Sequence, residues 1–340
     1  MKTREPKLLL TTSPFIKSPH DTRFIMWQVN YALLPVILAS VYYFGINAVL
    51  LIAVSLAGAL LPEWIWSRQQ NNPVNTIRDG SAVITGLLFA LTLPPGIPLW
   101  MAFLGGVVSV VLGKILFGGL GYNIFNPALV GRAFLQAAFP VSMTTWMPHA
   151  SLENFFQIRG DLLTLPFMKP RMDALSAATP LAKMKFEMQP TGITDLLLGS
   201  TAGSLGETAA VIILLAGIYL AIRGVINWRI PVGILATVFV LATLLHWVDG
   251  TKYPAPWFHL FAGGLMLGAV FMATDPVTSP ITQKGVWIFS VGVGLLVVVI
   301  RVWGGLPEGV MYSILLMNAL TPLINKVVRP RIYGMRKSES

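Results

Sequence analysis

Residues 24–44 read FIMWQVNYALLPVILASVYYF and include no charged side chain. A helix that crosses a bilayer needs about 20 mostly apolar residues, so this stretch is long enough for one crossing. It begins late in the chain, exceeds the apolar core of a typical signal peptide and lacks a clear small-residue cleavage site. The stretch therefore predicts a retained first transmembrane helix.

Similar apolar runs follow, separated by short connections that contain Gly and Pro. They occupy residues 47–61, 81–93, 99–117, 125–139, 208–222, 230–247, 257–273, 286–302 and 309–324. Together with the first run they predict about ten membrane spans. The short runs at 81–93 and 125–139 are expected to form tilted, broken or partly re-entrant helices. The expected fold class is an all-α integral membrane protein in which some helices are broken.

The composition also indicates lipid as the main solvent. Of the 340 residues, 55% are hydrophobic and 11% are charged, against about 25% charged in an ordinary soluble domain. The 24 Lys and Arg outnumber the 14 Asp and Glu, but the bases gather at the two ends, which argues against nucleic acid as a partner. The chain has no cysteine, so any redox role on this chain needs an organic cofactor.

The distribution of Lys and Arg predicts the orientation, because these residues stay on the cytoplasmic side near short loops. Basic residues flank the first and last runs: Lys2, Arg4, Lys7, Lys17, Arg23, Lys326, Arg329, Arg331, Arg336 and Lys337. Both termini are therefore expected in the cytoplasm, which requires an even number of spans. The same alternation places the long polar segment 141–206 in the periplasm, as an ordered loop or small cap.

A spaced pattern occurs twice and predicts an internal repeat. Gly-x-x-Phe-x-x-Thr-x-Pro-x-x-x-Pro begins at Gly86 and again at Gly268. The copies lie five runs apart, so they are expected to cross the membrane in opposite directions. The predicted organisation is a five-helix repeat at 1–140, the periplasmic loop at 141–206, a second five-helix repeat at 207–326 and a cytoplasmic tail at 327–340.

Paired Gly and Pro interruptions in such inverted repeats mark broken helices around an internal cavity, because lipid cannot satisfy the freed backbone groups. We therefore expect breaks near Thr92 and Thr274, with a central site between them. The alternative is that Gly and Pro recur only because both are common in membrane helices.

The outer segment contains residues 173–180, DALSAATP. Pro180 favours an extended conformation at Thr179, and the small neighbours leave its hydroxyl uncrowded for a modifying enzyme. The segment resembles the recognition sequence of the periplasmic flavin transferase, Asp-x-x-Ser/Thr-Gly/Ser-Ala-Thr, whose last Thr is esterified to the phosphate of FMN. Asp173, Ser176 and Ala178 fit that spacing, although Ala177 stands where Gly or Ser is usual. The resemblance implies covalent FMN on Thr179.

Further motifs extend the match over nearly the whole chain, which resembles the D subunit of the Rnf electron-transport complex. They are SPH at 18–20, DGS at 79–81, GGLGYN at 118–123, NPAL at 126–129, FMATDPVTSP at 271–280 and PEGVM at 307–311. A sister of that family is the B subunit of the sodium-pumping NADH:quinone reductase. The family implies a flavoprotein that relays electrons between ferredoxin and NAD within a complex and couples them to sodium or proton transport.

The resemblance also implies cofactors, partners and a location. A second, noncovalent flavin, riboflavin, is expected among the spans. The partners would be the A, B, C, E and G subunits of the Rnf complex, the flavin transferase during maturation, and the lipid of the bacterial inner membrane. No catalytic residue is assigned to this chain, because it carries no nucleotide-binding or hydrolase motif, so the NADH and iron–sulfur steps belong to the partner subunits.

Two charged residues within or beside apolar runs carry separate expectations. Arg132 should face protein, water or an anionic cofactor, because an arginine is costly against lipid. Asp275 lies at the break that follows the eighth run and is expected to cap a half-helix there, with contact to a cation as the alternative. The four histidines are dispersed, and their spacing does not predict a metal site.

A function of another class fits part of the pattern. A passive channel or solute carrier could be built on the inverted repeat without any redox centre. The segment around Thr179 discriminates between the two functions, because a channel has no use for a flavin attachment site.

Overall fold

The computed structural model describes residues 21–69, 77–150, 154–166, 168, 177–189, 191–207 and 210–329, and every regular element in these ranges is a helix. Six helices are long and apolar enough to cross a bilayer: α1 (Thr22–Phe44), α2 (Ile46–Gln69), α4 (Leu99–Gly113, continued by a 3₁₀ turn, Ile115–Phe117), α10 (Arg229–Val248), α13 (Gln283–Trp303) and α14 (Val310–Val327). The predicted all-α integral membrane class is confirmed.

Shorter helices complete the fold. They are α3 (Ser81–Leu91), α5 (Pro127–Ala138), α6 (Pro140–Thr144), α7 (Pro180–Ala182), α8 (Ile193–Leu198), α9 (Ala210–Ile222), α11 (Pro256–Phe261) and α12 (Leu265–Leu267), with π-helical turns at Lys183–Glu187 and Gly268–Met272. Every predicted apolar run coincides with helical residues. With 12 residues at about 1.5 Å per residue, α5 is shorter than the hydrocarbon core, so the count of ten spans stays a prediction.

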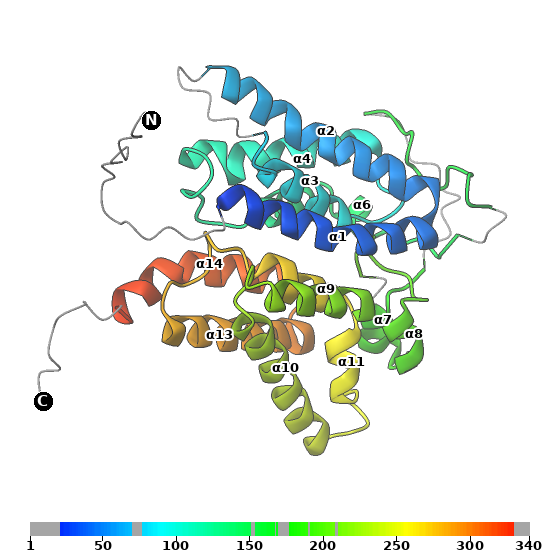
Figure 1. Ribbon diagram of the computed structural model, residues 1–340. Coiled ribbons are helices and arrows are strands. Elements are labelled where there is room, and N and C mark those ends of the chain that lie inside the picture. Colours follow the sequence, from blue (N-terminus) through cyan, green and yellow to red (C-terminus); the bar gives the residue numbers. More distant parts are fainter. Residues whose placement is uncertain are drawn as a thin grey trace, which may run out of the picture.

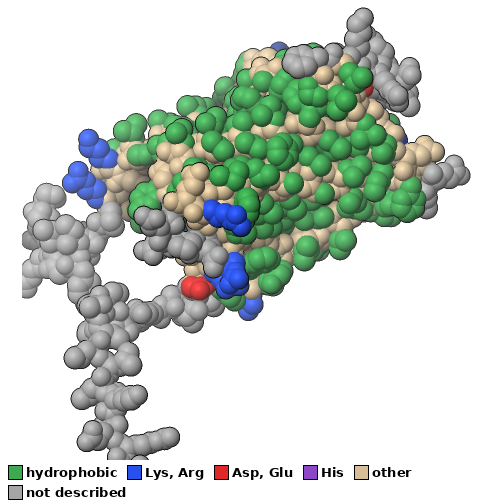
Figure 2. All heavy atoms as spheres, turned by 90° about the horizontal axis from the view of Figure 1, so that it is seen from above, with side chains coloured by type: hydrophobic (Ala, Val, Ile, Leu, Met, Phe, Trp, Pro, Cys, Tyr) green, Lys and Arg blue, Asp and Glu red, His purple; other side chains and the backbone are tan. Residues whose placement is uncertain are grey.

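The outer surface is apolar, as lipid contact requires. Large hydrophobic side chains such as Leu38 on α1, Leu116 beside α4 and Val240 on α10 are exposed. Figure 2 shows one face covered mostly by hydrophobic side chains, with few charged ones. A surface of this kind would be insoluble in water but is stable in a bilayer. The chain is a multi-pass membrane protein.

The two halves of the chain pack in the same way. In the first half α2 packs on α4 and α4 on α5, and in the second half α10 packs on α13 and α13 on α14. Figure 1 shows the helices of the first half above those of the second, with α1 beside α9 at the boundary. An internal repeat predicts this correspondence, although the division into two five-helix repeats stays a prediction.

Close helix crossings in both halves depend on glycine. A Cβ atom at Gly106 on α4 would come within 2.7 Å of the carbonyl oxygen of Ser55 on α2. A Cβ atom at Gly294 on α13 would come within 3.0 Å of the carbonyl oxygen of Ile234 on α10. Small residues allow membrane helices to approach closely enough for backbone packing. In each half of the chain a glycine at the crossing therefore allows two long helices to pack closely.

The first predicted break is present. The helix α3 ends at Leu91, and the hydroxyl of Thr92 donates to the carbonyl oxygen of Phe89, 2.7 Å away. The backbone beyond it is satisfied by protein, since Gly206 N–H donates to Leu91 O at 2.7 Å. Leu205 N–H likewise donates to Leu93 O at 3.1 Å. The break thus binds the end of the segment 141–206 through its backbone.

The second predicted break is also present, whereas the expected shared site stays a prediction. The eighth run is split into α11, α12 and the π-helical turn Gly268–Met272, and it ends before Thr274. The Asn126 side chain donates to the freed carbonyl of Met272 at 3.0 Å. Among the described residues, Thr274 lines the cavity at this break and Thr92 does not. At the first break the backbone of Leu205 and Gly206 is instead hydrogen-bonded to Leu93 and Leu91.

The segment 141–206 is here called the cap, and its described residues pack against the helix bundle. The side chain of Asn47 on α2 donates to the carbonyl oxygens of Pro95 and Arg159, at 3.1 and 2.9 Å. A small apolar cluster joins α7 and α8 to α11; it contains Leu181, Met184, Leu196, Phe258 and Ala262. Figure 1 shows α7 and α8 at the end of the bundle opposite to the start of α1 and the end of α14.

Reporter fusions test the predicted topology. A reporter inserted after Pro148 should be active on the periplasmic side, whereas one at Ser340 should be active on the cytoplasmic side. The reason is the retention of basic flanking residues in the cytoplasm. A topology assay with paired alkaline phosphatase and fluorescent protein fusions measures both positions. Reporters that lie on the same side would overturn the predicted five spans between these positions, and with them the count of ten.

Candidate functional site

A cavity of about 470 Å³ lies where the cap meets the two halves of the bundle. Its walls come from α5, α6, the cap, the loop before α14 and α14 itself, and include Arg132, Thr179, Glu207 and Glu308. We call it the Thr179 cavity. Small-molecule and cofactor pockets usually enclose about 300–1,000 Å³, so its size suits a cofactor.

Thr179 has the extended backbone that Pro180 predicts, with φ −67° and ψ 156°. Its side-chain oxygen accepts a hydrogen bond from the N–H of Ala182 at 3.2 Å and so caps α7. Its carbonyl oxygen accepts from the N–H of Lys183 at 2.9 Å. Oγ1 acts as an acceptor in this cap, and an ester oxygen can still accept a hydrogen bond, so modification of the hydroxyl is compatible with the local fold.

The expectation of an uncrowded, accessible hydroxyl is wrong for the folded chain. Thr179 is only 7% exposed, and it lines the Thr179 cavity instead of projecting into water. Two contacts hold it inside: the N–H of Ala177 donates to the carbonyl oxygen of Trp146 at 2.8 Å, and Leu181 packs into the apolar cluster with α11. A group attached to Thr179 would therefore start at the wall of this cavity.

The other predicted recognition residues divide into two groups. Asp173 and Ser176 lie outside the described residues. Ala178 lines the Thr179 cavity and also a polar groove of about 330 Å³ that His149 and Lys183 line as well. The small side chain at this position thus separates two open spaces.

The charges in the Thr179 cavity are paired unequally. Arg132 on α5 forms a salt bridge with Glu308, so the expectation that Arg132 faces protein is confirmed. Glu308 Oε1 also accepts a hydrogen bond from the N–H of Gly264 at 2.9 Å. Burial opposes ionisation of Glu308, but Arg132 and the N–H of Gly264 keep the pKa of Glu308 below its usual range. This carboxylate is ionised at neutral pH.

Sequence reasoning missed Glu207 as a site residue. It follows the cap directly, lines the Thr179 cavity and has its pKa raised to about 8, first by burial and then by the negative charge of Glu308. The sequence feature that could have revealed this residue is an acidic side chain directly before the apolar run 208–222. Its significance depends on Glu308, which lies about a hundred residues further along the chain.

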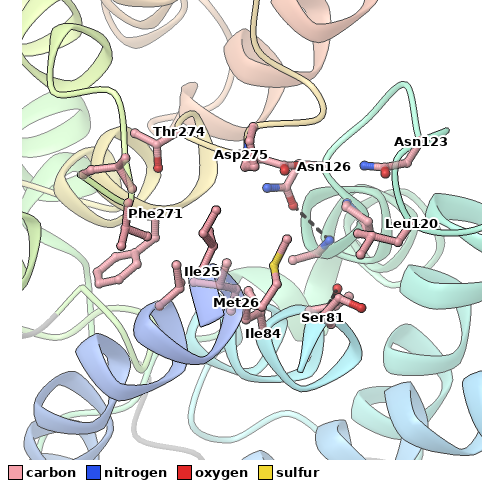
Figure 3. A pocket seen from close by; sticks show the side chains of 18 of the residues that line it. Ile25, Met26, Ser81, Ile84, Leu120, Asn123, Asn126, Phe271, Thr274 and Asp275 are labelled. Carbon is pink, nitrogen blue, oxygen red and sulfur yellow. Dashed lines mark hydrogen bonds between the residues drawn. The ribbon is translucent and has the colours of Figure 1, made fainter. Parts of the chain in front are cut away.

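A second, smaller cavity of about 70 Å³ lies at the break near Thr274 (Figure 3). We call it the break cavity. Asn123 and Asn126 face it from the segment before α5, and Asn126 Oδ1 also caps α5 by accepting from the N–H of Ala128 at 3.0 Å. Asp275 accepts from the N–H of Val277 at 3.2 Å within a turn. The next helix, α13, is capped by Thr282, so the expectation that Asp275 caps a half-helix is wrong.

Lys114, in the wall of the break cavity, forms a buried ion pair with Glu63, which sequence reasoning missed too. Lys114 Nζ lies 2.8 Å from Glu63 Oε1 and 2.7 Å from Ser81 Oγ. The side chains of Lys114 and Glu63 are 2% and 0% exposed. The signal was a lysine inside the apolar run 99–117 and a glutamate just after the run 47–61, which are costly unless they pair. Within the described ranges, no cluster of three or more His, Asp or Glu side chains is arranged to hold a metal ion.

Comparison with known proteins identifies the family. The model of the NQR2, RnfD, RnfE family matches residues 9–334. The chain belongs to this family. It is 40% identical to the D subunit of the proton-translocating ferredoxin:NAD(+) oxidoreductase complex of Clostridium ljungdahlii, over 96% of each chain. It is 43% identical to the D subunit of the ion-translocating oxidoreductase complex of Stutzerimonas stutzeri, over 91% of each chain.

A third relative differs in the ion that its name specifies. The D subunit of the Na(+)-translocating ferredoxin:NAD(+) oxidoreductase complex of Acetobacterium woodii is 39% identical, over 98% of this chain and 97% of the relative. Relatives named for protons and for sodium are thus about equally similar to this chain. Family membership places it among the D subunits of ion-translocating oxidoreductase complexes without deciding between the two ions.

Proposed function

We propose that this chain is the membrane flavoprotein of an ion-translocating ferredoxin:NAD oxidoreductase complex of the Rnf type, and that it relays electrons through FMN bound covalently to Thr179. The observation that carries the proposal is the position of Thr179. The last residue of a transferase-type segment opens into a cavity of about 470 Å³, which is large enough for a cofactor.

The residues around Thr179 suit a tethered flavin. The phosphoester would fix the cofactor at one end, and the apolar side chains of Met143, Trp146 and Met311 would enclose its ring. Arg132 supplies a positive charge in the same cavity, which favours an anionic group. When bound, FMN supplies the ability to accept and donate electrons, and the protein supplies its position.

A second, noncovalent flavin, riboflavin, belongs to the proposal on family resemblance. The break cavity offers suitable polar groups, because Asn123 Oδ1 is buried without a hydrogen-bond partner. However, its volume of about 70 Å³ is well below the usual range for ligand pockets. A flavin ring does not fit unless side chains such as Met26 move, so no electron-transfer step is assigned to this cavity.

The remaining parts of the function follow from the complex. We infer that the A, B, C, E and G subunits of the Rnf complex are the partners, that the flavin transferase acts on Thr179 during maturation, and that the inner membrane is the location with the Thr179 loop in the periplasm. The burial of Thr179 implies that the transferase acts before the cap closes. Electron flow through the complex would be coupled to sodium or proton movement.

Family membership favours this function over a passive channel or solute carrier. The named relatives are subunits of oxidoreductase complexes and match nearly the whole chain. A channel would also leave the transferase-type segment and its cofactor-sized cavity without a use.

Detection of the covalent flavin tests the proposal. The full chain should be expressed together with a periplasmic flavin transferase and purified in detergent. We expect yellow protein whose flavin fluorescence persists in a denaturing gel, because a phosphoester survives unfolding. Mass spectrometry of the peptide covering residues 172–183 should place the FMN adduct on Thr179. An unmodified peptide from cells with an active transferase would overturn the proposal.

A further inference from the structure

Two carboxyl groups converge in the Thr179 cavity from distant parts of the chain. Glu207 precedes α9, and Glu308 lies between α13 and α14. Both meet at Gly264: a Cβ atom there would lie 2.6 Å from Glu308 Oε1 and 3.5 Å from Glu207 Oε1. Both residues line the cavity that Thr179 lines. The position where a flavin would be attached therefore faces an acid pair.

The two acids have different partners. Glu308 is held by the salt bridge with Arg132 and by the N–H of Gly264. Glu207 takes part in neither of the two salt bridges found among the described residues. The other cation behind the pair, Arg301, donates to the carbonyl oxygens of His259 and Ala262. Glu207 is thus the member of the pair without a dedicated positive charge.

Neighbouring carboxyl groups away from bulk water do not readily ionise together, because the two negative charges repel each other. Glu308 holds its charge with Arg132, so the proton of the pair belongs to Glu207. The charged groups that face Glu207 are Glu308 from the loop before α14, Arg132 from α5 and Arg301 from α13. An additional negative charge in the cavity would strengthen the binding of that proton.

We propose that Glu207 binds a proton when the cofactor on Thr179 is reduced and releases it when the cofactor is reoxidised. The inference rests on the proposed function. One electron from the reductant adds one negative charge to the cavity, and Glu207 takes one proton from water to become a neutral acid. On reoxidation the electron leaves to the acceptor and the proton returns to water. The charge of the cavity is then the same in both states.

The sign of the pH dependence follows from the pKa of Glu207, which burial and the charge of Glu308 raise to about 8. Well below that pH Glu207 is protonated in both redox states, so no proton is taken up. Above it Glu207 is ionised beside the oxidised cofactor and becomes protonated on reduction. Because reduction above that pH consumes a proton, it becomes less favourable as the pH rises. The midpoint potential should then fall with rising pH, by at most about 59 mV per pH unit for one electron.

A potentiometric titration of the full chain carrying covalent FMN measures this dependence. The midpoint potentials of the wild type and of Glu207→Gln should be measured between pH 6 and 10. Subtracting one potential from the other removes the contribution of protonation of the flavin ring, which both proteins share. We expect the wild-type potential minus the Glu207→Gln potential to be constant below about pH 8 and to fall above it. Glu207→Asp should restore the dependence, and Glu187→Gln, an exposed glutamate of the cap, should leave it unchanged.

An infrared difference spectrum gives a second readout. Above pH 8, reduction should produce a protonated carboxyl band in the wild type that is absent from Glu207→Gln. Identical pH dependence and identical infrared bands in both proteins, with covalent FMN present, would overturn the role of Glu207 and leave the proposed function standing. If the wild-type chain carried no covalent FMN, the proposed function would be overturned, and the inference about Glu207 would fall with it.

Discussion

Replacing Thr179 by valine should abolish covalent FMN and reduce electron transfer by the intact complex to background. Valine has nearly the same shape as threonine but lacks the oxygen that forms the phosphoester. The lost helix cap of α7 costs about 1 kcal/mol, which is too little to unfold the chain. The expected defect is therefore the loss of the cofactor and not of the fold, measured as flavin per chain and as ferredoxin-dependent NAD reduction in membranes.

Two matched variants control this experiment. Thr144→Val makes the same substitution in the same cavity, at a hydroxyl that donates to the carbonyl oxygen of Pro140, and it should keep both flavin and activity. Thr179→Ser keeps an esterifiable hydroxyl and should keep part of the flavin. Full electron transfer by Thr179→Val without covalent flavin would show that electrons do not pass through this site.

The parts of the fold that the sequence predicted are those fixed by nearby residues. An apolar run of sufficient length must be helical in lipid, because only a helix satisfies its own backbone there. The breaks after Leu91 and before Thr274 follow from the local spacing of Thr and Pro. The extended backbone at Thr179 likewise follows from its neighbour, Pro180.

The environment of the candidate site could not be predicted in this way, because it depends on contacts between distant segments. Thr179 is buried because α5, α6 and the loop before α14 close around the cap. The salt bridge between Arg132 and Glu308 joins residues 176 positions apart. The sequence showed a costly arginine within an apolar run, but only the fold reveals its partner, Glu308, and the second acid beside it, Glu207.

The buried pair of Lys114 and Glu63 should be the most sensitive charge interaction in the bundle. Lys114→Met would leave the Glu63 carboxylate, 0% exposed, without its cation between apolar helices. Removal of one partner of a buried ion pair typically costs about 3–5 kcal/mol, because the remaining charge stays desolvated. Glu63→Met should be similarly destabilising, since it leaves the Lys114 ammonium with Ser81 Oγ as its remaining partner.

The double variant Lys114→Met, Glu63→Met should be much less unstable than either single variant, because apolar side chains of similar volume often replace a buried pair at little cost. Unfolding of the purified chain in detergent measures all three variants. Lys284→Met, at an exposed lysine near the start of α13, controls for the loss of a positive charge alone and should change stability little. If the double variant were as unstable as the sum of the two single variants, the two charges would not be coupled. The ion pair would then contribute nothing specific to the wall of the break cavity, and its burial would need another explanation.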